Sequence, residues 1–223
     1  MFRDRLDAGR ALAELVAGAI DDPESLVLAL PRGGVPIGYE VAREIGADLD
    51  VSLVRKLGLP GQEECAIGAI ASGGVRVLNA ALIKEVQLSY SIIDQITARE
   101  ECELQRREEL YRAGRPALPV QNRTVVLVDD GLATGATMKA ASLALRLQKP
   151  KRIIVAVPVA AEQTCHELRK DVDELICAHT PWPFMSVGTW YEDFSQTTDE
   201  EVQQFLTLLE QDRAKGCSGV QAF

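Results

Sequence analysis

The chain has 223 residues, 47% of them hydrophobic, and carries a formal net charge of −9 at pH 7. This is enough for one buried core, so we expect residues 1–223 to form a single domain. The acidic charge argues against nucleic acid or a membrane surface as partner. Charged residues near the start interrupt any secretory signal, and the longest apolar run, residues 153–161, is too short to span a membrane.

The five cysteines are scattered, without a Cys-x-x-Cys pair, and there are only two histidines. This usage argues against zinc or a disulfide framework and predicts reduced thiols. We therefore expect a cytoplasmic protein, and we expect it to be a homodimer.

The first third of the chain alternates helix and strand signals. Apolar residues recur at helical spacing through residues 3–20 and again through 35–44, and residues 25–30 are a short apolar run. Between that run and the second helix stands Pro31-Arg32-Gly33-Gly34. A glycine pair lets backbone N–H groups approach a ligand, and Arg32 adds a positive charge suited to phosphate oxygens. The pattern fits a diphosphate-binding loop, and it also fits an ordinary turn with a surface arginine.

The next stretch reads as a strand, a glycine-rich segment and a long helix. Residues 49–54 are a strand candidate that leads into Arg55 and Lys56. Residues 66–77 alternate small and aliphatic side chains around a glycine pair, which predicts a hairpin. Residues 91–113 carry Glu/Arg pairs at i,i+4 spacing, typical of an exposed helix. We expect four of its apolar residues to face the core: Ile92, Ile93, Ile96 and Leu104.

The most informative stretch is residues 124–138. Residues 124–128 are aliphatic or β-branched and predict a buried strand, which ends at Asp129 and Asp130. Small residues and two threonines follow before a predicted helix at 139–148, so backbone N–H groups can approach an anion closely. The carboxylates would repel a phosphate and should instead face sugar hydroxyls or Mg²⁺. The glycine spacing matches neither a Walker A loop nor a dinucleotide fingerprint.

The segment Val-Asp-Asp-Gly-Leu-Ala-Thr-Gly-Ala-Thr resembles the motif of type I phosphoribosyltransferases that binds 5-phosphoribosyl-1-pyrophosphate (PRPP), and its wording is closest to the adenine-type enzymes. The resemblance implies that Asp129 and Asp130 bind the ribose hydroxyls and Mg²⁺. It also implies that the following loop wraps the 5-phosphate through Gly131, Leu132, Ala133, Thr134, Gly135, Ala136 and Thr137. Arg32, Gly33 and Gly34 resemble the family's pyrophosphate loop, Lys56 should approach the pyrophosphate, and residues 58–74 should contain a mobile lid.

The last third of the chain continues the alternation. Residues 152–157 and 172–177 are strand candidates, and residues 161–170 and 199–213 are helical. The fold class expected is α/β, a parallel sheet flanked by helices. Residues 180–223 would form the family's C-terminal hood, which receives the acceptor. Its aromatic residues are candidates to stack on a base, above all Trp190 and Tyr191, with Trp182 and Phe194 beside them.

The expected reaction is transfer of the phosphoribosyl group from PRPP to a base or amine, with release of pyrophosphate. Arg32 and Lys56 would neutralise the leaving group, and Glu64 in the lid is a candidate general acid, as is Glu63. Ala133 stands where the 6-oxopurine enzymes carry an acidic residue, which argues against hypoxanthine or guanine as acceptor. The alternative function is a regulatory protein that senses PRPP or nucleotides with the same pocket.

Overall fold

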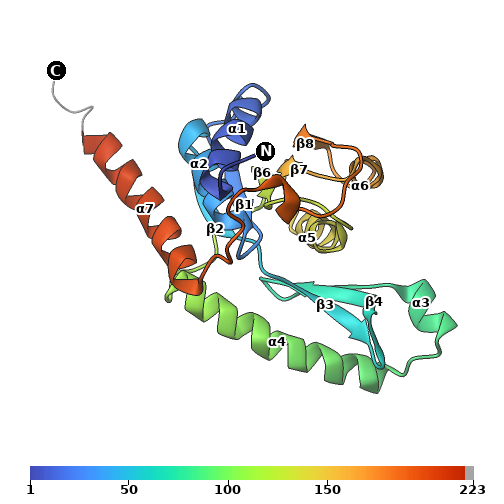
Figure 1. The fold of residues 1–223 in the computed structure, drawn as a ribbon. Coiled ribbons are helices and arrows are strands. Elements are labelled where there is room, and N and C mark those ends of the chain that lie inside the picture. Colours follow the sequence, from blue (N-terminus) through green and yellow to red (C-terminus); the bar gives the residue numbers. More distant parts are fainter. Residues whose placement is uncertain (219–223) are drawn as a thin grey trace.

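A computed structural model describes residues 1–218 of the chain, without the side chains of residues 63, 64 and 214–218 (Figure 1). Its centre is a five-stranded sheet in the order β2-β1-β6-β7-β8, and every neighbouring pair in it is parallel. The strands are β1 (Leu26–Ala29), β2 (Asp48–Val51), β6 (Thr124–Val128), β7 (Arg152–Val159) and β8 (Glu174–His179). The expected parallel sheet flanked by helices is confirmed.

Helices cover both faces of this sheet, as Figure 1 shows. Side chains of a strand alternate between the two faces, so Val126 and Val128 pack with α1 and α2, whereas Val125 and Leu127 pack with α5 and α6. Strands buried on both sides must be apolar throughout, which explains the uninterrupted runs in the sequence. The helices are α1 (Arg5–Ala17), α2 (Gly34–Ile45), α5 (Ala136–Leu147) and α6 (Glu162–Leu168).

The glycine-rich segment forms an arm that projects from the sheet (Figure 1). The arm consists of the antiparallel strands β3 (Val54–Leu59), β4 (Gln62–Ala71) and β5 (Val75–Leu78), followed by α3 (Ala80–Glu85). The expected hairpin is confirmed as β4 and β5. Most of residues 58–74, the segment expected to contain the mobile lid, is paired strand that buries Ile67 and Ile70, and its role as a lid stays a prediction.

The long helix α4 (Tyr90–Arg112) packs against the arm. Ile93, Ile96 and Leu104 are buried, as predicted, together with apolar residues of β3 and β4. Ile92 is 38% exposed, so its assignment to the core was wrong. The reason is its position one residue from Ile93, which rotates it away from the buried stripe of the helix.

The C-terminal segment lies against the start of the chain. The backbone of Phe2 pairs with that of Tyr191, one residue beyond the short helix η1 (Gly188–Trp190). Helix α7 (Asp199–Ser218) then packs on α2 and α4. The end of the expected hood, residues 219–223, lies outside the described residues. In the part that the structure covers, no helix combines the length and apolar character that crossing a bilayer requires.

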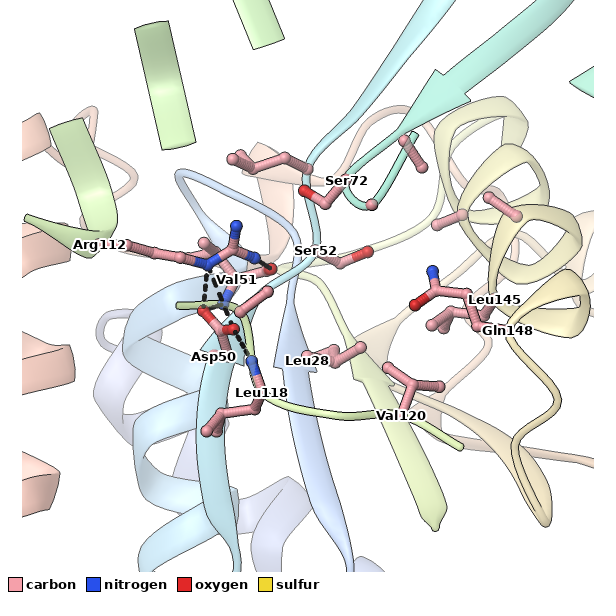
Figure 2. Close-up of a pocket in the computed structure, with 16 residues that line it drawn as sticks. Leu28, Asp50, Val51, Ser52, Ser72, Arg112, Leu118, Val120, Leu145 and Gln148 are labelled. Carbon is pink, nitrogen blue, oxygen red and sulfur yellow. Dashed lines mark hydrogen bonds and ion pairs between the residues drawn. The ribbon is translucent and has the colours of Figure 1, made fainter. Parts of the chain in front are cut away.

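A buried ion pair joins the end of α4 to the sheet, and Figure 2 shows it beside a cavity of about 60 Å³. Arg112 Nε lies 3.1 and 3.2 Å from the carboxylate oxygens of Asp50, and both side chains are only 8% exposed. Asp50 also accepts hydrogen bonds from the backbone N–H groups of Val51 and Leu118. Both charged groups are buried, so either one would be unfavourable without the other. The pair therefore fixes α4 against β2 only while both partners are present.

We expect Arg112→Met to lower the free energy of unfolding by about 3–5 kcal/mol, because it leaves the Asp50 carboxylate buried without its partner. Chemical denaturation measures this loss. Arg99→Met on the same helix is the control, and it should cost at most about 1 kcal/mol because that side chain is 69% exposed. Adding Asp50→Asn to Arg112→Met should restore part of the loss. Equal stability of the two single variants would contradict this role of the pair.

Candidate active site

Residues 31–34, called the diphosphate loop after their predicted ligand, lie against the acidic pair Asp129 and Asp130. Strands β1 and β6 are neighbours with Ala29 in register with Val128, so the segments that follow them leave the sheet side by side. A Cβ atom at Gly33 would lie 2.0 Å from Asp130 Oδ2, and one at Gly34 would lie 2.7 Å from the carbonyl oxygen of Val128. Any larger residue would force the two loops apart. The loops that follow Leu30 and Val128 therefore meet at one edge of the sheet.

Both carboxylates of the acidic pair are half-buried. Burial and the negative charge of Asp130 raise the pKa of Asp129 well above its usual value. Burial also raises the pKa of Asp130, although Arg5 acts in the opposite direction. Arg5 Nε donates to Asp130 Oδ2 at 2.9 Å, and the backbone N–H of Asp130 donates to Asp129 Oδ1 at 2.8 Å. The pair is therefore held in a position that is electrostatically unfavourable without a ligand.

These carboxylates fit a magnesium ion that shares its ligands with a substrate. Mg²⁺ is commonly held by one or two carboxylates while phosphate oxygens and water supply its other ligands. A cation next to both aspartates would also offset the repulsion that raises the pKa of Asp129. The described residues contain no group of three or more His, Cys, Asp or Glu side chains that could hold a metal alone.

Residues 131–137, called the phosphate turn after their predicted ligand, run from the acidic pair into the N-terminus of α5. Gly135 caps the helix with φ of +67°, a left-handed conformation that suits glycine. Thr164 of α6 donates to the carbonyl oxygen of Ala133 at 2.6 Å and so holds the turn from outside. Thr134 and Thr137 are exposed. The first N–H groups of a helix have no intrahelical acceptor, so this terminus can receive an anion.

A cavity of about 460 Å³ lies beside the diphosphate loop. Arg32, Gly33 and Asp130 border it, and so do side chains from α1, α4 and the segment before α7. Five charged or aromatic side chains of this lining were not among the site residues predicted from the sequence: Arg5, Arg106, Arg107, Tyr111 and Asp199. The only sequence signal was their charge or aromaticity, which is equally typical of a solvated helix face or a packed tail.

Lys56 and Arg55 lie on β3 of the arm and face different surroundings. Arg55 donates to Glu100 of α4 at 2.6 Å, so it anchors the arm to that helix. Lys56 is exposed and is not among the described residues that border the 460 Å³ cavity. The side chains of Glu63 and Glu64 lie outside the described residues, so the general acid stays a prediction.

The aromatic residues of the hood have two different placements. Tyr191 is 5% exposed, and its hydroxyl donates to the carbonyl oxygen of Asp130 at 2.6 Å. Trp190 packs beside it against the same core. Tyr191 thus supports the acidic pair from behind and presents no open face to an acceptor. Phe194 borders the cavity with its ring 4.1 Å from the guanidinium carbon of Arg5, and Trp182 is 92% exposed.

Comparison with known proteins finds relatives over nearly the whole chain. Residues 3–193 match the family model of the phosphoribosyl transferase domain. Two proteins from strains CDC 1551 / Oshkosh and H37Rv of Mycobacterium tuberculosis, whose names give phosphoribosyl transferase as a provisional assignment, are each 43% identical over 96% of this chain. The match covers 48% of their length, so the chain spans about half of these curated relatives.

A solved structure is similar over nearly the whole chain. The crystal structure of TT1426 from Thermus thermophilus is 43% identical, with a TM-score of 0.85, and the match covers 94% of this chain and 98% of that one. The family match spans both the diphosphate loop and the acidic pair, whose contact is described above. The chain therefore belongs to the phosphoribosyl transferase family and has the type I fold.

Proposed function

We propose that this protein transfers the 5-phosphoribosyl group of PRPP to a nitrogen atom of a base or amine and releases pyrophosphate. The observation that carries this proposal is the contact between Gly33 and Asp130. It puts a loop suited to a diphosphate directly beside carboxylates suited to sugar hydroxyls, with a helix N-terminus suited to a phosphate after them. PRPP combines these three groups in one molecule.

Each part of the site has a distinct task in this reaction. Asp129 and Asp130 accept hydrogen bonds from the ribose hydroxyls, and the phosphate turn donates backbone N–H groups to the 5-phosphate. Arg32 and Lys56 neutralise the charge that develops on the departing pyrophosphate. A magnesium ion held by the acidic pair would supply further positive charge to the pyrophosphate oxygens.

The chemistry places a second demand on the site, which is to keep water from the sugar carbon. The C1–oxygen bond breaks as the acceptor nitrogen approaches, so C1 resembles an oxocarbenium ion that water would also attack. The arm, which carries Lys56, is the part of the chain proposed to close over the substrates. Ala133 is exposed and carries no acidic group, which argues for an acceptor other than a 6-oxopurine.

The proposal also includes the cellular compartment and the oligomeric state of the protein. The four described cysteines, Cys65, Cys102, Cys165 and Cys177, are free thiols. Free thiols are typical of a reducing compartment, which supports the proposed cytoplasmic location. The homodimer stays a prediction.

Pyrophosphate release tests the enzyme against the sensor. The protein is incubated with PRPP, Mg²⁺ and a panel of bases and amines, and its melting temperature is measured with and without PRPP. We expect PRPP to raise the melting temperature, because it binds the folded state, and at least one acceptor to release pyrophosphate. Stabilisation by PRPP with no active acceptor would favour the sensor. No stabilisation would contradict both functions.

Lys56→Met should lower the rate of pyrophosphate release roughly tenfold to a hundredfold, because it removes one positive charge from the leaving-group side of the transition state. Arg76→Met is the matched control, since Arg76 lies on β5 of the same small sheet and pairs with Asp94 at 2.9 Å. The measurement is the steady-state rate of pyrophosphate release by each of the two variants. If both variants kept the rate of the unaltered protein, Lys56 would have no part in catalysis.

Asp129→Asn should stabilise the free protein and weaken PRPP binding. Because the pKa of Asp129 is raised in the folded state, ionisation of this group costs stability as the pH rises from the unfolded value of about 4 through the folded value. Melting temperatures of the variant should therefore exceed those of the unaltered protein increasingly above about pH 4. Asp22→Asn is a control of opposite sign, because hydrogen bonds from Thr124 and Lys151 lower the pKa of Asp22. Unchanged PRPP affinity in Asp129→Asn would exclude the Asp129 carboxylate from PRPP binding.

A further inference from the structure

The cavity beside the diphosphate loop has a wall that comes from α4. Arg106 and Arg107 of this helix border the same space as Arg32 and Gly33, although they lie more than seventy positions away in the sequence. A volume of about 460 Å³ is within the range of small-molecule sites, roughly 300–1,000 Å³. The helix therefore contributes to the site as well as packing against the arm.

The lining of this cavity is basic in an acidic protein. Its four arginines face two aspartates, so the charged lining residues sum to +2 (4 − 2), whereas the whole chain carries −9. A concave surface that gathers charge of one sign concentrates ions of the opposite sign. The cavity thus favours an anion.

Arg106 and Arg107 retain binding capacity for that anion. Both donate to the same carboxylate, Glu103, at 2.9 and 2.8 Å, and together they lower the pKa of Glu103 to about 2. Two guanidinium groups have about ten N–H donors, and one carboxylate has about four acceptor positions. One shared carboxylate therefore satisfies neither the charge nor the donors of the two arginines.

A further contact links the α4 wall to the diphosphate loop. The hydroxyl of Tyr111, one helical turn beyond Arg107, donates to Asp199 at 2.7 Å. Asp199 in turn lies 3.7 Å from Arg32. Burial and Asp199 raise the pKa of Tyr111 to about 12, so its hydroxyl remains a donor at neutral pH. Asp199 thereby connects α4 to the loop through one carboxylate.

We propose that Arg106 and Arg107 bind the pyrophosphate group together with Arg32, so that α4 supplies half of the leaving-group subsite. This inference rests on the proposed transfer reaction. As the C1–oxygen bond breaks, its electron pair remains on the pyrophosphate, while the acceptor nitrogen bonds to C1 and its proton passes to solvent. Paired guanidinium groups stabilise that added charge because each can form two parallel hydrogen bonds to phosphate oxygens.

The opposing interpretation is that both arginines only form exposed ion pairs on a helix. Arg99 provides an internal comparison, because it is 69% exposed on the same helix and pairs with Glu100 at 3.0 Å. Arg106 is similarly exposed at 60% and similarly paired. The difference is that Arg106 borders the cavity, and Arg99 is not among the described residues that do.

Titration with inorganic pyrophosphate tests the subsite without any turnover. Isothermal titration compares the full chain with the variants Arg106→Gln/Arg107→Gln and Arg99→Gln, at two salt concentrations. We expect the double variant to lose roughly ten- to a hundredfold in pyrophosphate affinity and to show a weaker salt dependence, while Arg99→Gln stays within about twofold. Equal affinity of all three proteins, or no binding to the unaltered protein, would overturn the proposal.

A second variant tests the subsite in case the double variant fails to fold. Arg107→Lys keeps the charge and loses the planar fork, so we expect a partial loss of pyrophosphate affinity with an unchanged melting temperature. Affinity of Arg107→Lys equal to that of the unaltered protein would count against the subsite even if the double variant failed to fold.

The failure of this subsite is distinguishable from the failure of the transfer reaction. Pyrophosphate release from PRPP is measured separately on the same proteins. If the unaltered protein turned over and the double variant had the same kcat and the same KM for PRPP, the α4 arginines would have no part in the subsite, while the transfer reaction would stand. If pyrophosphate binding depended on the arginines but no acceptor were turned over, the proposed subsite would be supported and the proposed transfer reaction would be contradicted.

Discussion

The close approach of Gly33 to Asp130 is the constraint on which the rest of the site depends. It exists because β1 and β6 are parallel neighbours in register, so that the segments following Ala29 and Val128 emerge together. A gap of 2.0 Å between a notional Cβ and a carboxylate oxygen leaves no room for any side chain. The register of β1 and β6 therefore brings the two loops together, and the absence of a side chain at Gly33 lets its backbone approach the Asp130 carboxylate closely.

In this half-buried position the negative charges of the acidic pair are unfavourable. Residues near both ends of the chain stabilise the pair. Two adjacent carboxylates in a half-buried position raise the pKa of Asp129, and Arg5 from the first helix offsets part of the charge on Asp130. Tyr191 holds the Asp130 backbone from the opposite end of the sequence. The residual cost is one that sugar hydroxyls or a cation would relieve, so the free site is prepared for a ligand.

The sequence predicts the sheet and the loops well because both follow from local patterns. Four aliphatic residues before Asp129 indicate a buried strand whatever surrounds it, and Gly33 beside Arg32 indicates a loop suited to anions. The packing of the arm could not be predicted from its glycines, because only the tertiary structure shows that Ile67 and Ile70 are buried in one cluster with residues of α4. Arg106 and Asp199 could not be placed, since only the tertiary packing of α4 and α7 brings them to the cavity.

The packing of the arm also limits how the site can close. Leu57, Ile67 and Ile70 of the arm share one apolar cluster with Ile93 and Ile96 of α4, and Arg55 bonds to Glu100 of the same helix. An arm packed in this way cannot fold over a ligand as a loose loop without exposing that cluster to water. The proposed closure would have to move β3 and β4 as one unit with the start of α4, or to slide the small sheet along the helix. Since α4 also carries Arg106 and Arg107, a closure that moved this helix together with the arm would change the lining of the cavity as well as the position of Lys56.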